Sequence, residues 1–104
     1  MNEEKLIELA EQTARQLPEV TRNEWEHWTQ IAKRYGLDQA VQWSERLSRD
    51  VTLRPAVKRA NQLIAKAVNS HRKRLKELSP EERDQVFGYV SRVLAVETVR
   101  GSLQ

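Results

Sequence analysis

The sequence predicts an all-α fold, a single-domain bundle of about five helices. The 104 residues suffice for one modest core but not for two. Apolar residues make up 38% of the chain and recur at the three- and four-residue spacing of amphipathic helices. Only three glycines and three prolines are present, too few turn residues for a sheet of many strands.

The first helix is predicted over residues 3–17, where leucine and alanine recur on one helical face. Glu3 and Glu4 lie in its first turn, where the positive end of the helix dipole stabilises negative charge. Pro18 follows, and proline cannot continue a helix because it lacks the backbone N–H group. The first helix is therefore expected to end just before Pro18.

Two further helices are predicted over residues 22–35 and 38–49. Thr21 and Glu24 have the spacing of a capping box, in which each side chain bonds the other residue's backbone N–H group. The second helix should therefore begin there. Gly36 is placed to end it in the left-handed conformation that glycine adopts readily. The third helix is shorter, and a connector follows it.

The last two helices are predicted over residues 55–78 and 80–100. A proline opens each of them, and proline is favoured at the first helical position because the N–H group it lacks has no helical partner there. Ser79 and Glu82 form a second capping box at the start of the last helix. The pattern therefore predicts two long helices joined at Ser79.

The fourth predicted helix lies in a strongly basic segment. Residues 51–76 contain eight Lys or Arg residues and no Asp or Glu, whereas the rest of the chain carries 10 basic and 15 acidic residues. The formal net charge of +3 therefore conceals a basic pole and an acidic remainder. An exposed helix usually mixes both signs in i,i+4 pairs, so the missing acid needs an explanation.

A helical projection of the predicted helix separates an apolar face from a cationic face, which carries no carboxylate as far as Lys76 and which we expect to lie in water. The simplest interpretation is that these lysines and arginines lie on a solvated helix face and bind nothing. A cationic stripe roughly 35 Å long also fits the phosphate backbone of a nucleic acid. The residues predicted to bind RNA or DNA are Lys58, Arg59, Lys66, Arg72, Lys73 and Lys76. An acidic protein surface is the alternative partner.

Three tryptophans lie close together in the sequence. Trp25 and Trp28 have the spacing of one helical face and are predicted to lie in the core. Trp43 falls at the edge of the apolar stripe of the third helix, where its ring is a candidate for stacking on an unpaired base. Aromatic stacking beside a basic helix is one way in which single strands are held.

The segment 31–43 resembles a helix-turn-helix, the DNA-binding motif in which a glycine follows an alanine by four residues and a buried branched residue follows the glycine by six. Ala32 and Gly36 match this pattern. The sixth residue after Gly36 is Gln42, however, and the branched Val41 comes one position early. The departure favours a glycine-terminated corner between two helices over DNA reading.

The fifth predicted helix carries more apolar surface than one neighbouring helix would cover. Tyr89, Val96 and Val99 lie outside its main apolar stripe. Such a wide stripe indicates either a central place in the bundle or a face left for a second copy of the chain. These three residues are therefore candidates for a homo-oligomer interface.

The residue inventory argues against an enzyme. The chain has no cysteine, which excludes disulfides and thiolate nucleophiles and permits a reducing compartment. Glu24 and His27 form one Glu-x-x-His pair, but a carboxylate metal site of that type needs a second pair. His71 lies on an apolar face, as a hydrogen-bonded core residue would. We therefore predict no catalytic residue, no metal and no cofactor.

The sequence also gives an expectation about membranes. No apolar run is long enough for a signal peptide or a membrane span. The apolar side of the fourth predicted helix is rich in alanine and lacks the Trp or Phe that anchors interfacial helices. A cytoplasmic protein without a membrane partner is predicted.

Overall fold

The structure is a computed structural model that describes the backbone of residues 2–103 and the side chains of residues 2–96. Within residues 2–103 it contains five helices and no strand, which confirms the predicted all-α fold. The helices are α1 (Glu3–Arg15), α2 (Arg22–Tyr35), α3 (Leu37–Ser48), α4 (Pro55–Glu77) and α5 (Pro80–Leu103).

The helix boundaries follow the capping signals. Thr21 and Glu24 form the predicted capping box at the start of α2, with hydrogen bonds of 3.1 Å and 2.9 Å. Ser79 and Glu82 form the second one at the start of α5, at 3.2 Å and 3.0 Å. Each box satisfies backbone N–H groups that have no partner within the helix. Both predictions are confirmed.

Gly36 alone joins α2 to α3. Its φ of +95° lies in the left-handed region that favours glycine, as the sequence predicted, whereas its ψ of 159° is extended. The N–H group of Gly36 donates to the carbonyl of Ala32 at 2.9 Å and its own carbonyl accepts from Ala40 at 3.1 Å. One residue therefore ends one helix and begins the next.

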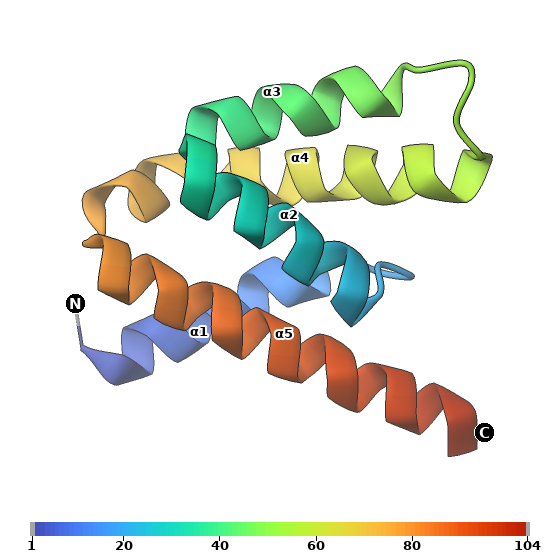
Figure 1. Cartoon of the computed structure of the whole chain (residues 1–104). Helices are drawn as coiled ribbons and strands as arrows, with labels where there is room; N and C mark the ends of the chain where they lie inside the picture. The colour runs from blue at the N-terminus through green and yellow to red at the C-terminus, as the bar shows by residue number, and fades with distance from the viewer. Residues whose placement is uncertain (1, 104) are drawn as a thin grey trace.

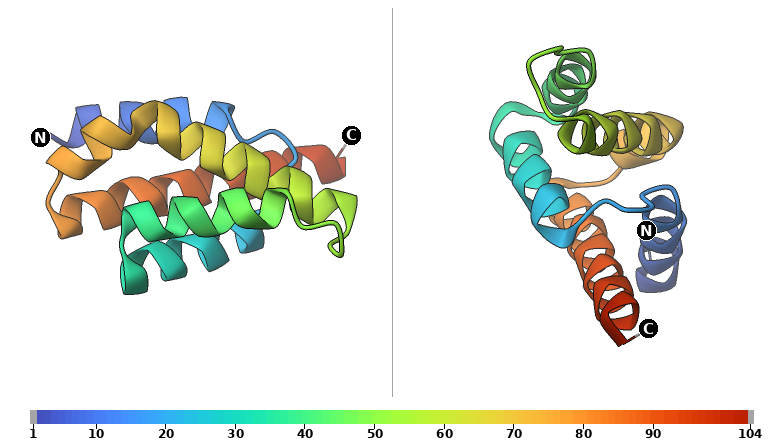
Figure 2. Two further views of the ribbon diagram at one scale, coloured as in Figure 1. Left: turned by 90° about the horizontal axis from the view of Figure 1, so that it is seen from above. Right: turned by 90° about the vertical axis from the view of Figure 1, so that its right-hand side faces the viewer.

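The five helices form two layers linked by α2. The antiparallel helices α3 and α4 pack side by side in one layer, and α1 packs on α5 in the other (Figure 1). α2 contacts both α3 and α5 and thus bridges the layers (Figure 2). The result is a slab of 41 × 36 × 20 Å. α3 and α4 lie together along one edge of this slab (Figure 2).

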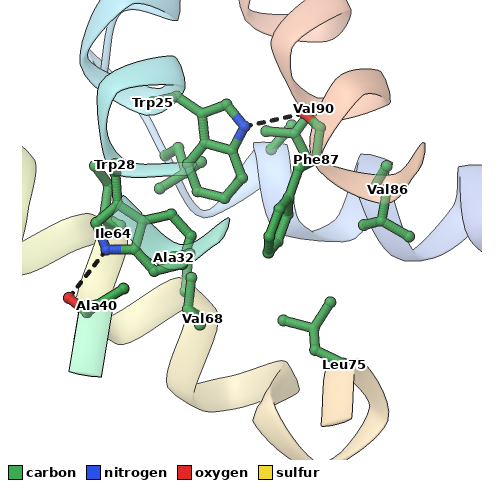
Figure 3. Close-up of a cluster of buried hydrophobic side chains, with 14 of the residues drawn as sticks. Trp25, Trp28, Ala32, Ala40, Ile64, Val68, Leu75, Val86, Phe87 and Val90 are labelled. Carbon is green, nitrogen blue, oxygen red and sulfur yellow. Dashed lines mark hydrogen bonds between the residues drawn. The ribbon is translucent and has the colours of Figure 1, made fainter. Parts of the chain in front are cut away.

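The core is centred on two tryptophans of α2. Trp25 and Trp28 stack with ring centroids 5.2 Å apart, and the Phe87 ring of α5 meets both of them edge-on (Figure 3). The Trp25 indole N–H donates to the carbonyl of Phe87 and that of Trp28 to the carbonyl of Ala40, each at 3.1 Å. Both polar ends are thereby satisfied inside the core, as buried tryptophans require. The predicted core position of these tryptophans is confirmed.

The rotation of α3 about its axis decides which of its residues reach the solvent. Ala40, Val41 and Ser44 are fully buried, whereas Gln42 is exposed. A helix-turn-helix would bury position 42, so the corner between α2 and α3 departs from that motif as its sequence does. The Ser44 hydroxyl has no hydrogen-bond partner among the described residues. Its helical acceptor, the carbonyl of Ala40, already receives the Trp28 indole.

Candidate nucleic-acid interface

The basic helix α4 meets a carboxylate on its α3 side. The Nζ atom of Lys76 donates to Oδ2 of Asp38 at 2.8 Å, and Nε of Arg72 lies 3.5 Å from Oδ1 of the same carboxylate, an ion pair without hydrogen-bond geometry. The hydrogen bond from Lys76, with the charges of Lys76 and Arg72, lowers the pKa of Asp38 below its usual value. One carboxylate of α3 thus engages two of the six residues predicted to bind phosphate.

A second carboxylate engages α4 from the other side. Nε of Arg59 donates to Oε2 of Glu19 at 3.2 Å. Glu19 lies in the connector between α1 and α2 with a φ of +68°, an uncommon conformation for a residue other than glycine. The expectation of a cationic face without a carboxylate is therefore wrong for Arg59, Arg72 and Lys76. The carboxylates that pair with these three cations come from distant parts of the sequence.

Lys66 and Lys73 keep the character expected from the sequence. Both are exposed, and neither forms an ion pair with any residue that the structure describes. They are seven positions apart in the sequence, so their Cα atoms lie about 10 Å apart along one side of α4. Lys58 is half-buried near Asp50, whose pKa is lowered by hydrogen bonds from Thr52 and less by the Lys58 charge. Lys66 and Lys73 are thus the two free cations at the centre of the predicted stripe.

Around Ser70, His71 and Arg74, the α1 side of α4 is held by hydrogen bonds in which no carboxylate takes part. Gln16 Oε1 accepts from the Ser70 hydroxyl at 2.9 Å and lies 3.1 Å from Nε2 of His71. Nδ1 of His71 lies 2.8 Å from NH2 of Arg74, which makes Nδ1 the acceptor and Nε2 the donor of a neutral imidazole. Burial and the Arg74 charge lower the pKa of His71. His71 is a packed residue between helices, as the sequence indicated.

The exposed side of α3 adjoins this part of α4. Both acidic residues of α3, Asp38 and Glu45, lie at its α4 edge, where Glu45 accepts a hydrogen bond from Asn69 at 3.2 Å. Glu45 also lies 3.8 Å from Arg49. We define the α3–α4 face by six exposed residues: Gln39, Gln42 and Arg46 of α3, Arg49 at its C-cap, and Lys66 and Lys73 of α4.

Trp43 lies beside this face rather than on α4. Its indole is partly buried and meets the His27 ring edge-on, with centroids 5.9 Å apart. On its other side it lines a groove of about 310 Å³ between α2 and α3. The groove is also lined by Ile31, Tyr35, Gln39, Gln42 and Arg46. The structure therefore leaves part of Trp43 accessible, in a groove that the sequence did not reveal.

The three residues proposed for self-association have different surroundings. The Tyr89 hydroxyl donates to Glu3 Oε1 at 3.0 Å, and the Arg92 guanidinium lies 5.6 Å from the Tyr89 ring centroid. Tyr89 thus connects α5 to α1 within one chain. Val96 is 49% exposed, and the side chain of Val99 lies outside the described residues. Self-association through α5 stays a prediction.

The described part of the chain has neither a helix that could span a membrane nor a cluster of metal ligands. None of its helices has the length and apolarity needed to cross a lipid bilayer. No three His, Asp or Glu side chains there converge as a metal site would require. The carboxylate of Glu24, in the Glu-x-x-His pair, accepts from the Thr21 backbone instead.

Comparisons of the chain with models of protein families, with the sequences of curated proteins and with solved structures gave no match. The fold and the surface therefore define the class of protein: a small all-α bundle with a polar, cationic face on α3 and α4.

Sequence reasoning overlooked the contribution of α3 to this face. Gln39, Gln42 and Arg46 recur at three- and four-residue intervals, which places them on one side of a helix. That signal was visible, but the two acids of α3 obscured it. Only the structure shows that both acids are directed toward α4.

Proposed function

We propose that this protein is a non-catalytic nucleic-acid-binding domain that contacts the phosphate backbone through the α3–α4 face. One observation carries the proposal: Arg46, Lys66 and Lys73 are exposed on adjacent helices without an ion pair to any described residue. Cations of this kind attract phosphates regardless of base sequence, because the attraction comes from charge alone. Binding of backbone charge rather than of sequence is the expected mode.

Two neighbouring features support a continuous surface. Lys76 and Asn69, on the outer side of α4, bond to Asp38 and Glu45 of α3, so the outer sides of the two helices meet along this line. The helices run side by side along one edge of the slab (Figure 2). A backbone crossing that line reaches cations from both helices.

The ion pairs reduce the number of phosphate contacts that the face can make. The sequence alone suggests six phosphate-binding residues on α4. Arg59, Arg72 and Lys76 are engaged by carboxylates and Lys58 is half-buried, so Lys66 and Lys73 remain on α4. Arg46 of α3 adds a third cation, and Arg49 is held only loosely by Glu45. For three to four contacts, the logarithm of affinity should fall with the logarithm of salt at a slope of about −2 to −3.6.

Fluorescence anisotropy tests this proposal. Labelled oligonucleotides of random sequence, single-stranded and duplex, are titrated with protein between ~50 and ~200 mM salt. Binding with a slope in the expected range supports the proposal. If no RNA or DNA of either strandedness is retained at ~50 mM salt, where electrostatic binding is strongest, the proposal is wrong.

A specific observation favours one alternative. Arg59 and Lys76 of α4 already form ion pairs with the carboxylates of Glu19 and Asp38, so a carboxylate of another protein is a suitable ligand for such cations. An adaptor that binds an acidic protein surface through the same face, alone or as a homo-oligomer, is therefore the second candidate, and it takes precedence if nucleic acid is not retained. A cytoplasmic location belongs to both proposals, because a chain without cysteine suits a reducing compartment.

A further inference from the structure

We infer that the groove between α2 and α3 binds an unpaired nucleobase of a single strand whose backbone lies on the α3–α4 face. This inference rests on the proposed function and adds a subsite to it. The groove has a volume of about 310 Å³, at the lower end of the range of small-ligand pockets. A flat ring of the size of a nucleobase suits such a site.

Aromatic side chains border the groove from both helices. Tyr35 of α2 is 55% exposed, and the Arg34 guanidinium lies 5.4 Å from the centroid of its ring. Trp43 of α3 lines the same groove and is supported from behind by His27. Every base has a π-face that can stack on exposed rings of this kind.

Polar groups suited to base edges lie beside the rings. Gln39 and Gln42 line the groove, and no described residue forms a hydrogen bond with either side chain. A glutamine amide offers two donors and an acceptor, which match the edges of adenine and other bases. Arg46 adds a guanidinium fork without an ion-pair partner among the described residues. No carboxylate lines the groove, so nothing in it repels a phosphate or a base carbonyl.

The groove is continuous with the proposed backbone path. Gln42 and Arg46 also line a shallow hollow that contains Arg49 and Glu45, and this hollow leads to the α4 side of α3. A strand that crosses Lys66 and Lys73 can therefore turn one base over α3 into the groove. A paired base cannot do this, because its faces are stacked and its Watson–Crick edge is occupied. The site should thus distinguish single strands from duplexes.

Two substitutions in the groove test this inference. Trp43→Leu keeps an apolar side chain but removes the π-face, and Tyr35→Leu does the same at an exposed position where the fold should not suffer. Each should weaken binding of a single-stranded oligonucleotide of roughly 12–16 nucleotides by about 5- to 150-fold, the equivalent of ~1–3 kcal/mol per stacked base. Binding of a duplex of the same length should not change. Tyr89→Leu, the same chemical change on α5, is the matched control and should alter neither.

The outcomes separate this inference from the proposed function. If Trp43→Leu and Tyr35→Leu weaken the binding of the single strand and leave the binding of the duplex unchanged, the base site is supported. Equal loss of both affinities, or no loss of either, overturns it while the salt-dependent binding of the wild-type protein still stands. Absence of any wild-type binding overturns the proposed function and the base site with it.

Fluorescence gives an independent check of the base site. A single strand should quench the indole emission of the wild-type protein. Trp43→Phe should remove that quenching, because Trp25 and Trp28 are buried.

Discussion

Helices α3 and α4 differ in how their charges are used. In the sequence, α4 is the strongly basic helix, whereas α3 contains two acids among its polar residues. In the structure, Asp38 of α3 engages Arg72 and Lys76 of α4. The exposed sides then become similar: Lys66 and Lys73 remain on α4, and two glutamines and one arginine remain on α3, with Arg49 at its C-cap. Cationic character that the sequence assigns to one helix is thus shared between two.

The comparison teaches why a run of like charge survives over residues 55–76 of α4, which contain no Asp or Glu. Counter-charges for this run come from neighbouring segments, Glu19 before α2 and Asp38 on α3, so the run does not need acids within it. Pairs of this kind at the surface contribute little to stability, about 0–1 kcal/mol each. Their main consequence is to decide which cations a ligand can reach.

Charge reversal of the two free lysines should have the largest effect. In Lys66→Glu/Lys73→Glu, two attractive contacts become repulsive, and affinity for an oligonucleotide should fall roughly 100-fold or more at ~50 mM salt. The helical circular dichroism should be unchanged, because both side chains are exposed. Lys5→Glu/Arg15→Glu on α1 changes the net charge equally and is the control. An equal loss in the control would show that net charge, not the α3–α4 face, governs binding.

Removal of the Asp38 charge should have the opposite effect. Asp38→Asn frees Lys76 and Arg72 for phosphates, so the affinity should rise and the salt slope should steepen by about 0.7–0.9 for each new contact. Anisotropy over the same salt range measures both quantities. Unchanged or weaker binding would mean that these two cations do not face the ligand.

His71, on the α1 side of α4, should make the stability of the protein, rather than its binding, depend on pH. Because the folded-state pKa of His71 is lowered, the neutral form is favoured on folding. Its contribution is fully present above the unfolded pKa of about 6.5 and is lost as the pH falls through the folded value. Urea unfolding of the wild-type protein and of His71→Gln between pH 8 and pH 5 measures the difference. A wild-type protein that gains stability relative to the variant on acidification would contradict the described hydrogen bonds.

A small effect on stability tests the rotation of α3. Ser44→Ala removes a buried hydroxyl that has no partner, so the free energy of unfolding should stay the same or rise by up to about 1 kcal/mol. Thermal or urea denaturation measures it. If the substitution instead costs more than about 1 kcal/mol, the hydroxyl has a partner and α3 is rotated differently, with other residues on the α3–α4 face.

Local signals in the sequence account for most of the fold. Each capping box depends on residues three apart, and the apolar periodicity of each helix depends on its own residues. The first predicted helix is two residues too long because Leu17 is buried in the turn after α1, where an apolar residue does not imply a helix. The ψ angle of Gly36 is extended, which the sequence did not predict, because the same residue also begins α3.

The site was less predictable because it depends on contacts between helices. Lys66 and Lys73 were found from charge alone. The pairing of Arg59 with Glu19 joins residues 40 positions apart, and that of Lys76 with Asp38 joins residues 38 apart. No local pattern contains such information. The groove beside Trp43 depends in addition on how α2 and α3 meet at Gly36.

The salt dependence of two variants of equal net charge tests most directly whether pairing between helices decides which cations bind phosphate. Lys73→Gln removes a free cation, and Asp38→Asn/Arg72→Gln/Lys76→Gln removes a paired cluster, so each lowers the net charge by one. Lys73→Gln should flatten the log–log slope by about 0.7–0.9, while the triple variant should leave the slope unchanged. A triple variant whose slope flattens as much as that of Lys73→Gln would contradict the account.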